Sequence, residues 1–287
     1  MHLNVVFLDS RAAGKTEQRI FVARAYVTVN VPSKNIRRFV LLLLALVSRD
    51  ITARYRRSLL GPLWAILQPL ILMVLFTLLR GIVSIPSDGI PYVLFSYAAL
   101  VPWTFFTNAL SFCGPSVVLN GPIIKKIALP REVFPLAAVT TALFDLIMAG
   151  LVLVGMMVWF RVPVGWSLLW TPVLILLIAA LAFGVGMFIA SLGTFRLDFI
   201  IATPFLTQFW LYATPVMYPL SSVPDHWQTL YMLNPMVGII EGFRSILLQN
   251  APPPLAALGW SVLMTIVILA ITWPLFRWFS RYFADVV

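Results

Sequence analysis

VPVGWSLLWTPVLILLIAALAFGVGMFIASLGTF, residues 162–195, contains no charged side chain. An α-helix needs about 20 residues to cross the roughly 30 Å hydrocarbon core of a bilayer. The stretch is therefore long enough for one membrane-spanning helix, but not comfortably long enough for two helices and a turn. It predicts a single span near residues 169–193.

Five further stretches between charged residues pass the same length test, and each predicts one more span. The six predicted spans lie near residues 63–83, 91–113, 133–159, 169–193, 199–218 and 256–276. The composition agrees, because 61% of the residues are apolar and only 10% are charged, whereas soluble domains carry roughly 25% charged residues. These values exclude a soluble enzyme, a disordered tail and a disulfide scaffold. We predict an all-α integral membrane protein with six transmembrane helices.

Lysine and arginine are distributed unequally among the predicted loops. Eleven of the 20 basic residues precede the first span. A cytoplasmic N-terminus would place 17 of the 20 basic residues inside and the other 3 outside. Cytoplasmic loops of membrane proteins are enriched in these residues. Both termini are therefore predicted to be cytoplasmic. The net charge of +10 is attributed to topology and lipid contact, and no nucleic-acid partner is predicted.

Tryptophan positions give an independent check on the predicted span ends, because amphipathic rings favour the membrane interface. Seven tryptophans lie close to a predicted end: Trp64, Trp159, Trp166, Trp170, Trp260, Trp273 and Trp278. Only Trp103 and Trp210 fall near the middle of a span.

The chain before the first span divides into two parts. Residues 1–35 form a cytoplasmic segment with no predicted structure, and residues 36–58 are predicted to form an amphipathic helix in the membrane interface, ahead of the transmembrane domain at 59–287. The side chains expected in lipid are Phe39, Leu42, Leu43 and Leu46. Those expected to face head groups or a partner are Arg49, Arg54, Arg56 and Arg57. The alternative is that these arginines only fix the topology.

Residue types that carry catalysis or bind metals are sparse. A single cysteine, Cys113, and two histidines rule out an internal disulfide and argue against a metal site. The ten acidic residues are scattered along the chain, so no carboxylate cluster for acid–base chemistry is visible, although distant residues could converge in space. Gly14-Lys15-Thr16 resembles the end of a phosphate-binding loop, but Asp9 stands where that pattern requires glycine. No cofactor site is predicted, and ATP would have to be bound by another chain.

Asp145 is the one charged residue near the middle of a predicted span. A carboxylate at that depth costs roughly 2.5–3.5 kcal/mol on insertion scales, so it should have a partner. A structural, hydrogen-bonded role and a role in transport both remain open.

Three further stretches carry a resemblance to a known family. They read RYRRSLLGPLWAILQPL (54–70), GPIIKKIALPREVFP (121–135) and NPMVGIIEGFR (234–244). Together, and over residues 36–280, the chain resembles the ABC-2-type polysaccharide-export permeases, which export O-antigen, capsule and teichoic acid. One departure is FRLD at 195–198, where relatives often show RYRD.

The resemblance implies a half-transporter of the bacterial cytoplasmic (inner) membrane that works as a homodimer with two copies of a separate ATPase subunit. ATP and Mg would be bound by that subunit. The substrate implied is a lipid-linked polysaccharide, passing between the two copies along the first, second and fifth spans. The alternatives are an ABC-2 exporter of a lipid or drug-like molecule and a membrane-embedded glycan-modifying enzyme.

Aromatic side chains deep in the spans are candidates for a sugar path, because sugar C–H faces stack on rings. The candidates are Tyr97, Trp103, Phe106, Trp210, Tyr212 and Tyr218. The alternative for each ring is ordinary core packing.

The cytoplasmic loop 114–132 combines length with charge. Lys125, Lys126, Arg131 and Glu132 lie around Pro130, and a short helix there resembles the coupling helix through which the family contacts its ATPase. Arg54, Arg56 and Arg57 would form a second contact. The alternative is a plain positively charged loop.

The last external segment, 219–255, contains an apolar stretch at 236–248 that is too short to span. It predicts a re-entrant or surface helix with Asn234 as its N-cap and Pro235 in its first position. Glu241 and Arg244 are three residues apart and can pair on that helix. The resemblance suggests short helices here that gate the external mouth, and the alternative is a simple external hairpin.

Overall fold

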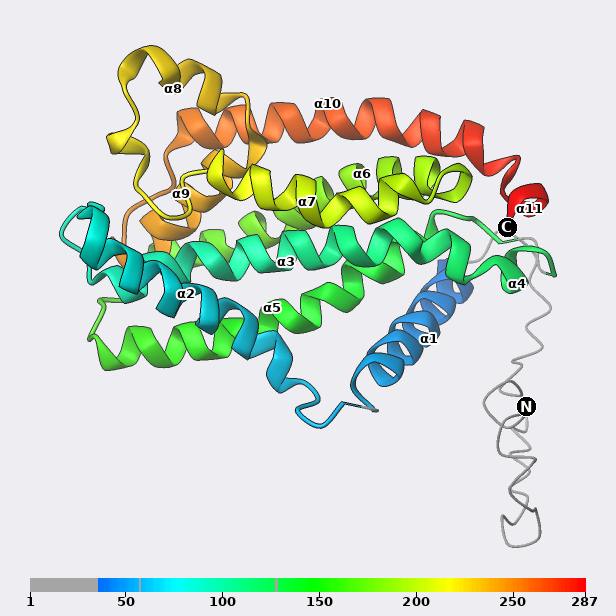
Figure 1. Cartoon of the computed structure of the whole chain (residues 1–287), viewed down its shortest axis with the longest axis horizontal. Helices are drawn as coiled ribbons and strands as arrows, with labels where there is room; N and C mark the ends of the chain where they lie inside the picture. Colours follow the sequence, from blue (N-terminus) through cyan, green and yellow to red (C-terminus); the bar gives the residue numbers. More distant parts are fainter. Residues whose placement is uncertain (1–35, 57, 127–128) are drawn as a thin grey trace, which may run out of the picture. The chain divides into compact units, whose positions relative to one another are not determined.

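A computed structural model of the chain describes residues 36–56, 58–126 and 129–287 (Figure 1). The chain divides into two units between Arg38 and Phe39, and only the start of the first helix is described in the first unit. The predicted segment 1–35 therefore lies outside the described residues, and so does Arg57.

The described part of the chain is helical and contains no strand. Its elements in chain order are α1 (Ile36–Tyr55), α2 (Leu63–Val83), α3 (Tyr92–Leu119), α4 (Gly121–Ile124), α5 (Val133–Trp159), η3 (Trp166–Trp170), α6 (Thr171–Phe195), α7 (Asp198–Tyr212), η4 (Leu220–Ser222), α8 (Asp225–Met232), α9 (Pro235–Leu248), α10 (Leu255–Ser280) and α11 (Phe283–Val286). Figure 1 shows α4 and α11 together at one end of the bundle, here called the α4 end, and α8 and α9 toward the other, the α9 end.

Five helices among the described residues are long and apolar enough to cross a membrane. They are α2, α3, α5, α6 with η3, and α10, and they match five of the six predicted spans. The remaining predicted span, 199–218, is only partly helical, because α7 has 15 residues and ends at Tyr212. At about 1.5 Å per residue such a helix is shorter than the hydrocarbon core. A turn at 213–216 replaces its predicted last turn, and Pro215 in that turn disfavours a further helical turn because it has no backbone N–H.

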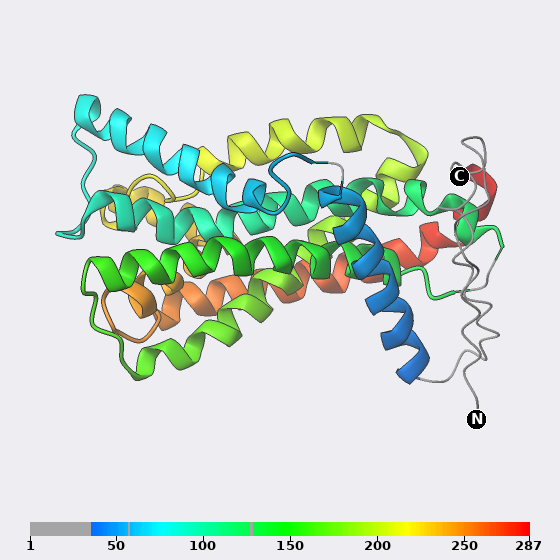
Figure 2. The same ribbon diagram turned by 90° about the horizontal axis from the view of Figure 1, so that it is seen from below.

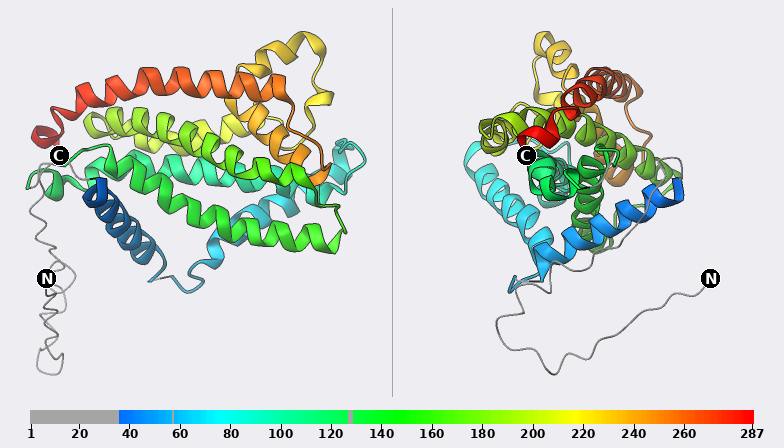
Figure 3. Two further views of the ribbon diagram at one scale, coloured as in Figure 1. Left: turned by 180° about the vertical axis from the view of Figure 1, so that it is seen from behind. Right: turned by 90° about the vertical axis from the view of Figure 1, so that its right-hand side faces the viewer.

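Helix α3 forms the centre of the bundle, and 20 of its 28 residues are buried. It contacts α2, α5, α6, α7 and α9. The end-on view in Figure 3 shows α2 and α7 on one side of α3. Helices α3 and α6 approach closely because Gly186 has no side chain, since a Cβ there would lie 2.7 Å from the Cys113 sulfur. Small residues allow such close contact between helices in membranes.

Helix α1 lies obliquely against the bundle, as Figure 2 shows. Its predicted lipid face packs on protein instead. Leu46 is buried in a cluster with Val117, Phe134 and Phe276, and Phe39, Leu42 and Leu43 pack against that cluster. The large apolar side chains exposed on the described part of α1 are Val40, Leu41 and Leu44. The helix was predicted correctly but its orientation was wrong, because an apolar stripe fits lipid and protein equally well.

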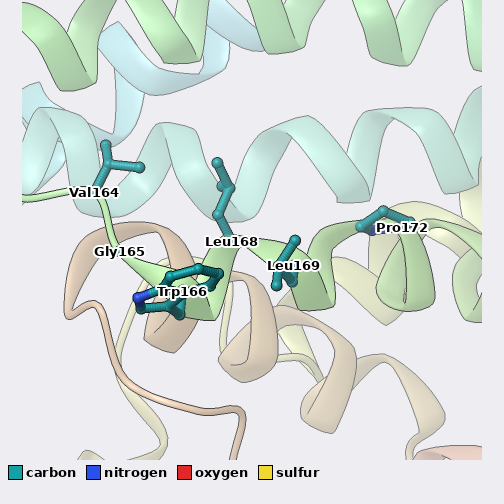
Figure 4. Close-up of a pocket in the computed structure, with 6 residues that line it drawn as sticks. All are labelled: Val164, Gly165, Trp166, Leu168, Leu169 and Pro172. Atoms are coloured by element: carbon teal, nitrogen blue, oxygen red, sulfur yellow. The ribbon is translucent and has the colours of Figure 1, made fainter.

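The seven tryptophans predicted near span ends are all exposed on this chain. Trp166, for example, is 88% exposed at the α5–α6 turn, where it lines an apolar pocket of about 450 Å³ with Val164, Gly165, Leu168, Leu169 and Pro172 (Figure 4). Exposure of these rings agrees with an aromatic belt at the membrane interface.

Candidate functional site

Three of the predicted path residues lie in the core of the chain. Tyr97 and Phe106 are completely buried, and Trp103 is 3% exposed. Phe106 packs between two tryptophans, with ring centroids 6.0 Å from Trp103 and 5.1 Å from Trp210. Tyr97, Trp103 and Phe106 therefore pack in the core of this chain, whereas they were predicted to line a path. Depth in a span does not distinguish a pore-facing ring from a core ring.

The other three predicted path residues lie on or beside α7. The half-buried Trp210 donates a hydrogen bond from Nε1 to Asn234 Oδ1 at 2.9 Å. The Tyr218 hydroxyl lies 2.9 Å from that of Tyr231 and donates to the Tyr212 carbonyl. Tyr212 itself is exposed. It belongs to an apolar stripe along one face of α7, together with Ile201, Phe205 and Phe209, all exposed.

Exposed polar side chains within the long helices gather on one side of the bundle. Gln68 on α2, Ser111 on α3 and Gln208 on α7 are exposed, and Asn108 on α3 is partly exposed. On α5, α6 and α10 the exposed side chains are apolar, apart from Arg277 near the end of α10. Amide side chains are unfavourable in contact with lipid. The surface formed by these four polar residues and the α7 stripe, here called the α2–α3–α7 face, is therefore suited to water or a polar ligand.

The helix predicted within 236–248 was predicted correctly in its local features. Asn234 caps α9 by accepting a hydrogen bond from the Met236 N–H at 3.1 Å, and Pro235 is its first residue. Arg244 pairs with Glu241 at 2.9 Å. Every residue of α9 except Glu241 is buried, so the helix is embedded in the protein and does not lie on a surface. Burial raises the pKa of Glu241, and the neighbouring Arg244 guanidinium opposes this shift.

Two side chains of this region hold the end of α7 in place. Arg244 donates hydrogen bonds to the carbonyls of Pro215 and Val216, both at 2.6 Å. Asn234 donates to the Ala213 carbonyl and to Thr214 Oγ1, at 3.2 and 2.8 Å. These bonds satisfy backbone carbonyls of the turn that follows α7. The predicted gate residues and the end of α7 thus form one hydrogen-bonded unit.

The four predicted coupling residues of the loop 114–132 gather at the α4 end. Lys125, Lys126, Arg131 and Glu132 line a pocket of about 640 Å³. Arg277 and Arg281, from the other end of the sequence, complete its charged lining, and Arg277 pairs with Glu132 at 3.0 Å. Five basic groups around one carboxylate make this pocket suitable for an acidic partner surface.

Asp145 has the partners that its position requires. Arg54 lies 3.3 Å from its carboxylate, and Tyr55 and Asn108 donate hydrogen bonds to it. The guanidinium of Arg54 also lies 3.2 Å from the centre of the Phe112 ring. Arg54 was predicted to face head groups or a partner, but in this structure it pairs within the chain, because a buried carboxylate attracts a nearby cation. Arg56 remains exposed.

Sequence reasoning missed several residues of these sites. Arg277 and Arg281 are far from the coupling loop in sequence, and nothing local links them to it. Gln68, Asn108 and Gln208 carried a signal that could have been used, because each is an uncharged amide inside a predicted span. Among the described residues, no three histidine, cysteine or acidic side chains come close enough to hold a metal ion.

Five long apolar helices, one of them the buried central helix α3, with the accessible amides of α2, α3 and α7 on one outer face, define a multi-pass membrane protein. A family model described as ABC-2 type transporter matches residues 41–248. The chain belongs to this family, and it is a transporter subunit rather than an enzyme.

Curated relatives extend the match over most of the chain. An O-antigen export system permease protein from Myxococcus xanthus is 32% identical over 227 residues, which cover 76% of this chain and 85% of that protein. The corresponding permease protein of Klebsiella pneumoniae is 27% identical, with 73% and 81% covered. A polysialic acid transport protein of Escherichia coli is 24% identical, with 81% and 91% covered.

Proposed function

We propose that this chain is the membrane subunit of an ATP-driven exporter that moves a lipid-linked polysaccharide across the cytoplasmic (inner) membrane. The names of the relatives support this substrate class. The observation in the structure that carries it is the α2–α3–α7 face, where amides lie beside an exposed aromatic stripe. Hydroxyl groups of a glycan can exchange hydrogen bonds with amides, while its C–H faces pack on rings.

The proposed working unit is a homodimer with two copies of an ATPase subunit that binds ATP and Mg. The path lies between the α2–α3–α7 faces of the two copies. The α4 end is cytoplasmic, as the excess of basic residues favours. In this arrangement α8 and α9 gate the external mouth. The sixth crossing of the membrane is made by α7 together with the turn and the gate helices that follow it.

The proposed function predicts glycan transport that depends on ATP. Proteoliposomes containing this chain and its ATPase subunit should move a lipid-linked polysaccharide across the bilayer only when ATP is added. The permease alone should hydrolyse no ATP. Transport of a phospholipid analogue without any transport of glycan would contradict the proposal, and so would ATP hydrolysis by the permease alone.

The pocket at the α4 end is proposed to receive the ATPase subunit. Reversing three charges, in a Lys125→Glu, Lys126→Glu and Arg131→Glu variant, should reduce copurification of the ATPase at least ten-fold, because the lining would change from basic to acidic. Membrane insertion should persist, since eleven basic residues before the first span fix the topology.

Arg196→Glu provides the matched control for charge reversal, because Arg196 is exposed at the same end but outside the pocket. It should leave ATPase copurification unchanged. Wild-type copurification and export by the triple variant would identify the loop as a topology signal only.

A further inference from the structure

A line of polar contacts connects helix α1 with the α2–α3–α7 face. Asp145 on α5 accepts hydrogen bonds from Tyr55 and from Asn108 Nδ2, the latter at 3.4 Å, and it pairs with Arg54. The same Asn108 Nδ2 lies 3.4 Å from Gln68 Oε1 on α2. The line thus begins at a buried carboxylate and ends at an exposed amide.

The carboxylate determines which way the two amides point. An ionised carboxylate can only accept hydrogen bonds, so Asn108 must turn its NH₂ group toward Asp145. Gln68 then turns its oxygen toward that NH₂ group. Asn108 Oδ1, an acceptor, and Gln68 Nε2, a donor, are left on the partly exposed side, and neither has a hydrogen-bond partner within the described residues.

We propose that Asn108 and Gln68 form a subsite that binds hydroxyl groups of the passing glycan, and that Asp145 is the residue that positions Asn108. This inference rests on the proposed function. A sugar hydroxyl both donates and accepts, so it can donate to Asn108 Oδ1 and accept from Gln68 Nε2. Two neutral hydrogen bonds of this kind hold a sugar weakly, as a path that must release each unit requires.

Removing either amide should weaken binding of the glycan. In proteoliposomes with the ATPase subunit, Asn108→Leu and Gln68→Leu should each raise the glycan concentration for half-maximal export about two- to ten-fold, the range expected for one neutral hydrogen bond. The yield of folded protein should stay near the wild-type level, so that export can be compared per folded molecule. Leu151→Ala serves as the control, because Leu151 is an exposed side chain of α5 outside this face.

The role of Asp145 can be tested by a conservative rescue. Asp145→Leu removes the acceptor that orients Asn108 and should raise the half-maximal glycan concentration as much as Asn108→Leu does. Asp145→Asn retains an acceptor oxygen and should restore most of the affinity. Equal loss of folded protein in both Asp145 variants, with an unchanged glycan concentration dependence, would show that Asp145 has only a structural role.

Accessibility of position 68 to water tests the subsite without measuring export. The native Cys113 is completely buried, so Gln68→Cys in a Cys113→Ala background gives a single reactive position. A charged, water-soluble thiol reagent should modify it at least ten-fold faster than Leu151→Cys, and bound lipid-linked glycan should slow the modification. Equal rates at the two positions would place Gln68 in lipid and overturn the subsite.

The proposed function and the Asn108–Gln68 subsite can be contradicted separately. No glycan transport by the wild-type complex would overturn the proposed function and the subsite together. Normal transport with unchanged glycan dependence in both Asn108→Leu and Gln68→Leu would overturn the subsite alone.

Discussion

Replacing Arg244 with methionine should remove most of the folded protein from the membrane. The Arg244 side chain is 3% exposed and binds the carbonyls of Pro215 and Val216 at the end of α7. The substitution would leave these carbonyls without their donor and Glu241 without its cation. Breaking a buried pair of this kind costs about 3–5 kcal/mol, against a total stability of about 5–15 kcal/mol for a typical domain.

The measurement is the yield of monodisperse protein in detergent and its unfolding temperature. Arg196→Met is the matched control, because Arg196 is exposed and should tolerate the change. Adding Glu241→Gln to Arg244→Met should recover part of the stability, since an unpaired amide is less costly to bury than an unpaired carboxylate. Wild-type stability of Arg244→Met would show that the end of α7 is held by Asn234 and packing alone.

The features that were predicted correctly depend on neighbours in sequence. The cap at Asn234, the proline in the first turn of α9 and the Glu241–Arg244 pair each involve residues at most three positions apart. Local geometry of this kind follows directly from helix periodicity. The existence of five spans follows in the same way from length and composition.

The features that were missed depend on whether a given face of a helix contacts lipid, the protein core or a partner. Leu46 packs on protein, whereas the neighbouring Leu44 is exposed, although both are apolar residues of α1. In a membrane protein the same side chain is compatible with lipid, with the core and with a partner, so hydropathy does not separate these cases. The partner of Asp145 illustrates the same limit: the need for one followed from the sequence, but its identity as Arg54 did not.

The clearest test of the proposed path along the α2–α3–α7 face compares two phenylalanine residues. Phe106 is completely buried between Trp103 and Trp210, whereas Phe209 on α7 is 75% exposed. Phe106→Ala should destabilise the protein by about 3–5 kcal/mol, because it leaves a cavity in the core. Most of the folded protein should therefore be lost, and export should fall in proportion to the amount of protein.

Phe209→Ala should behave in the opposite way, because truncating an exposed ring leaves no cavity. The yield of folded protein should stay near the wild-type level, while export per folded molecule should drop several-fold if the α7 stripe contacts the glycan or the second copy. Ile147→Ala on α5 controls for loss of an exposed apolar side chain elsewhere on the bundle. If Phe106→Ala protein is stable but its export is impaired, the glycan path runs through the interior of the chain, beside Phe106. Full export by Phe209→Ala would show that the α7 stripe does not line the path. An exposed ring that contacts the glycan cannot be deleted without an effect on glycan transport.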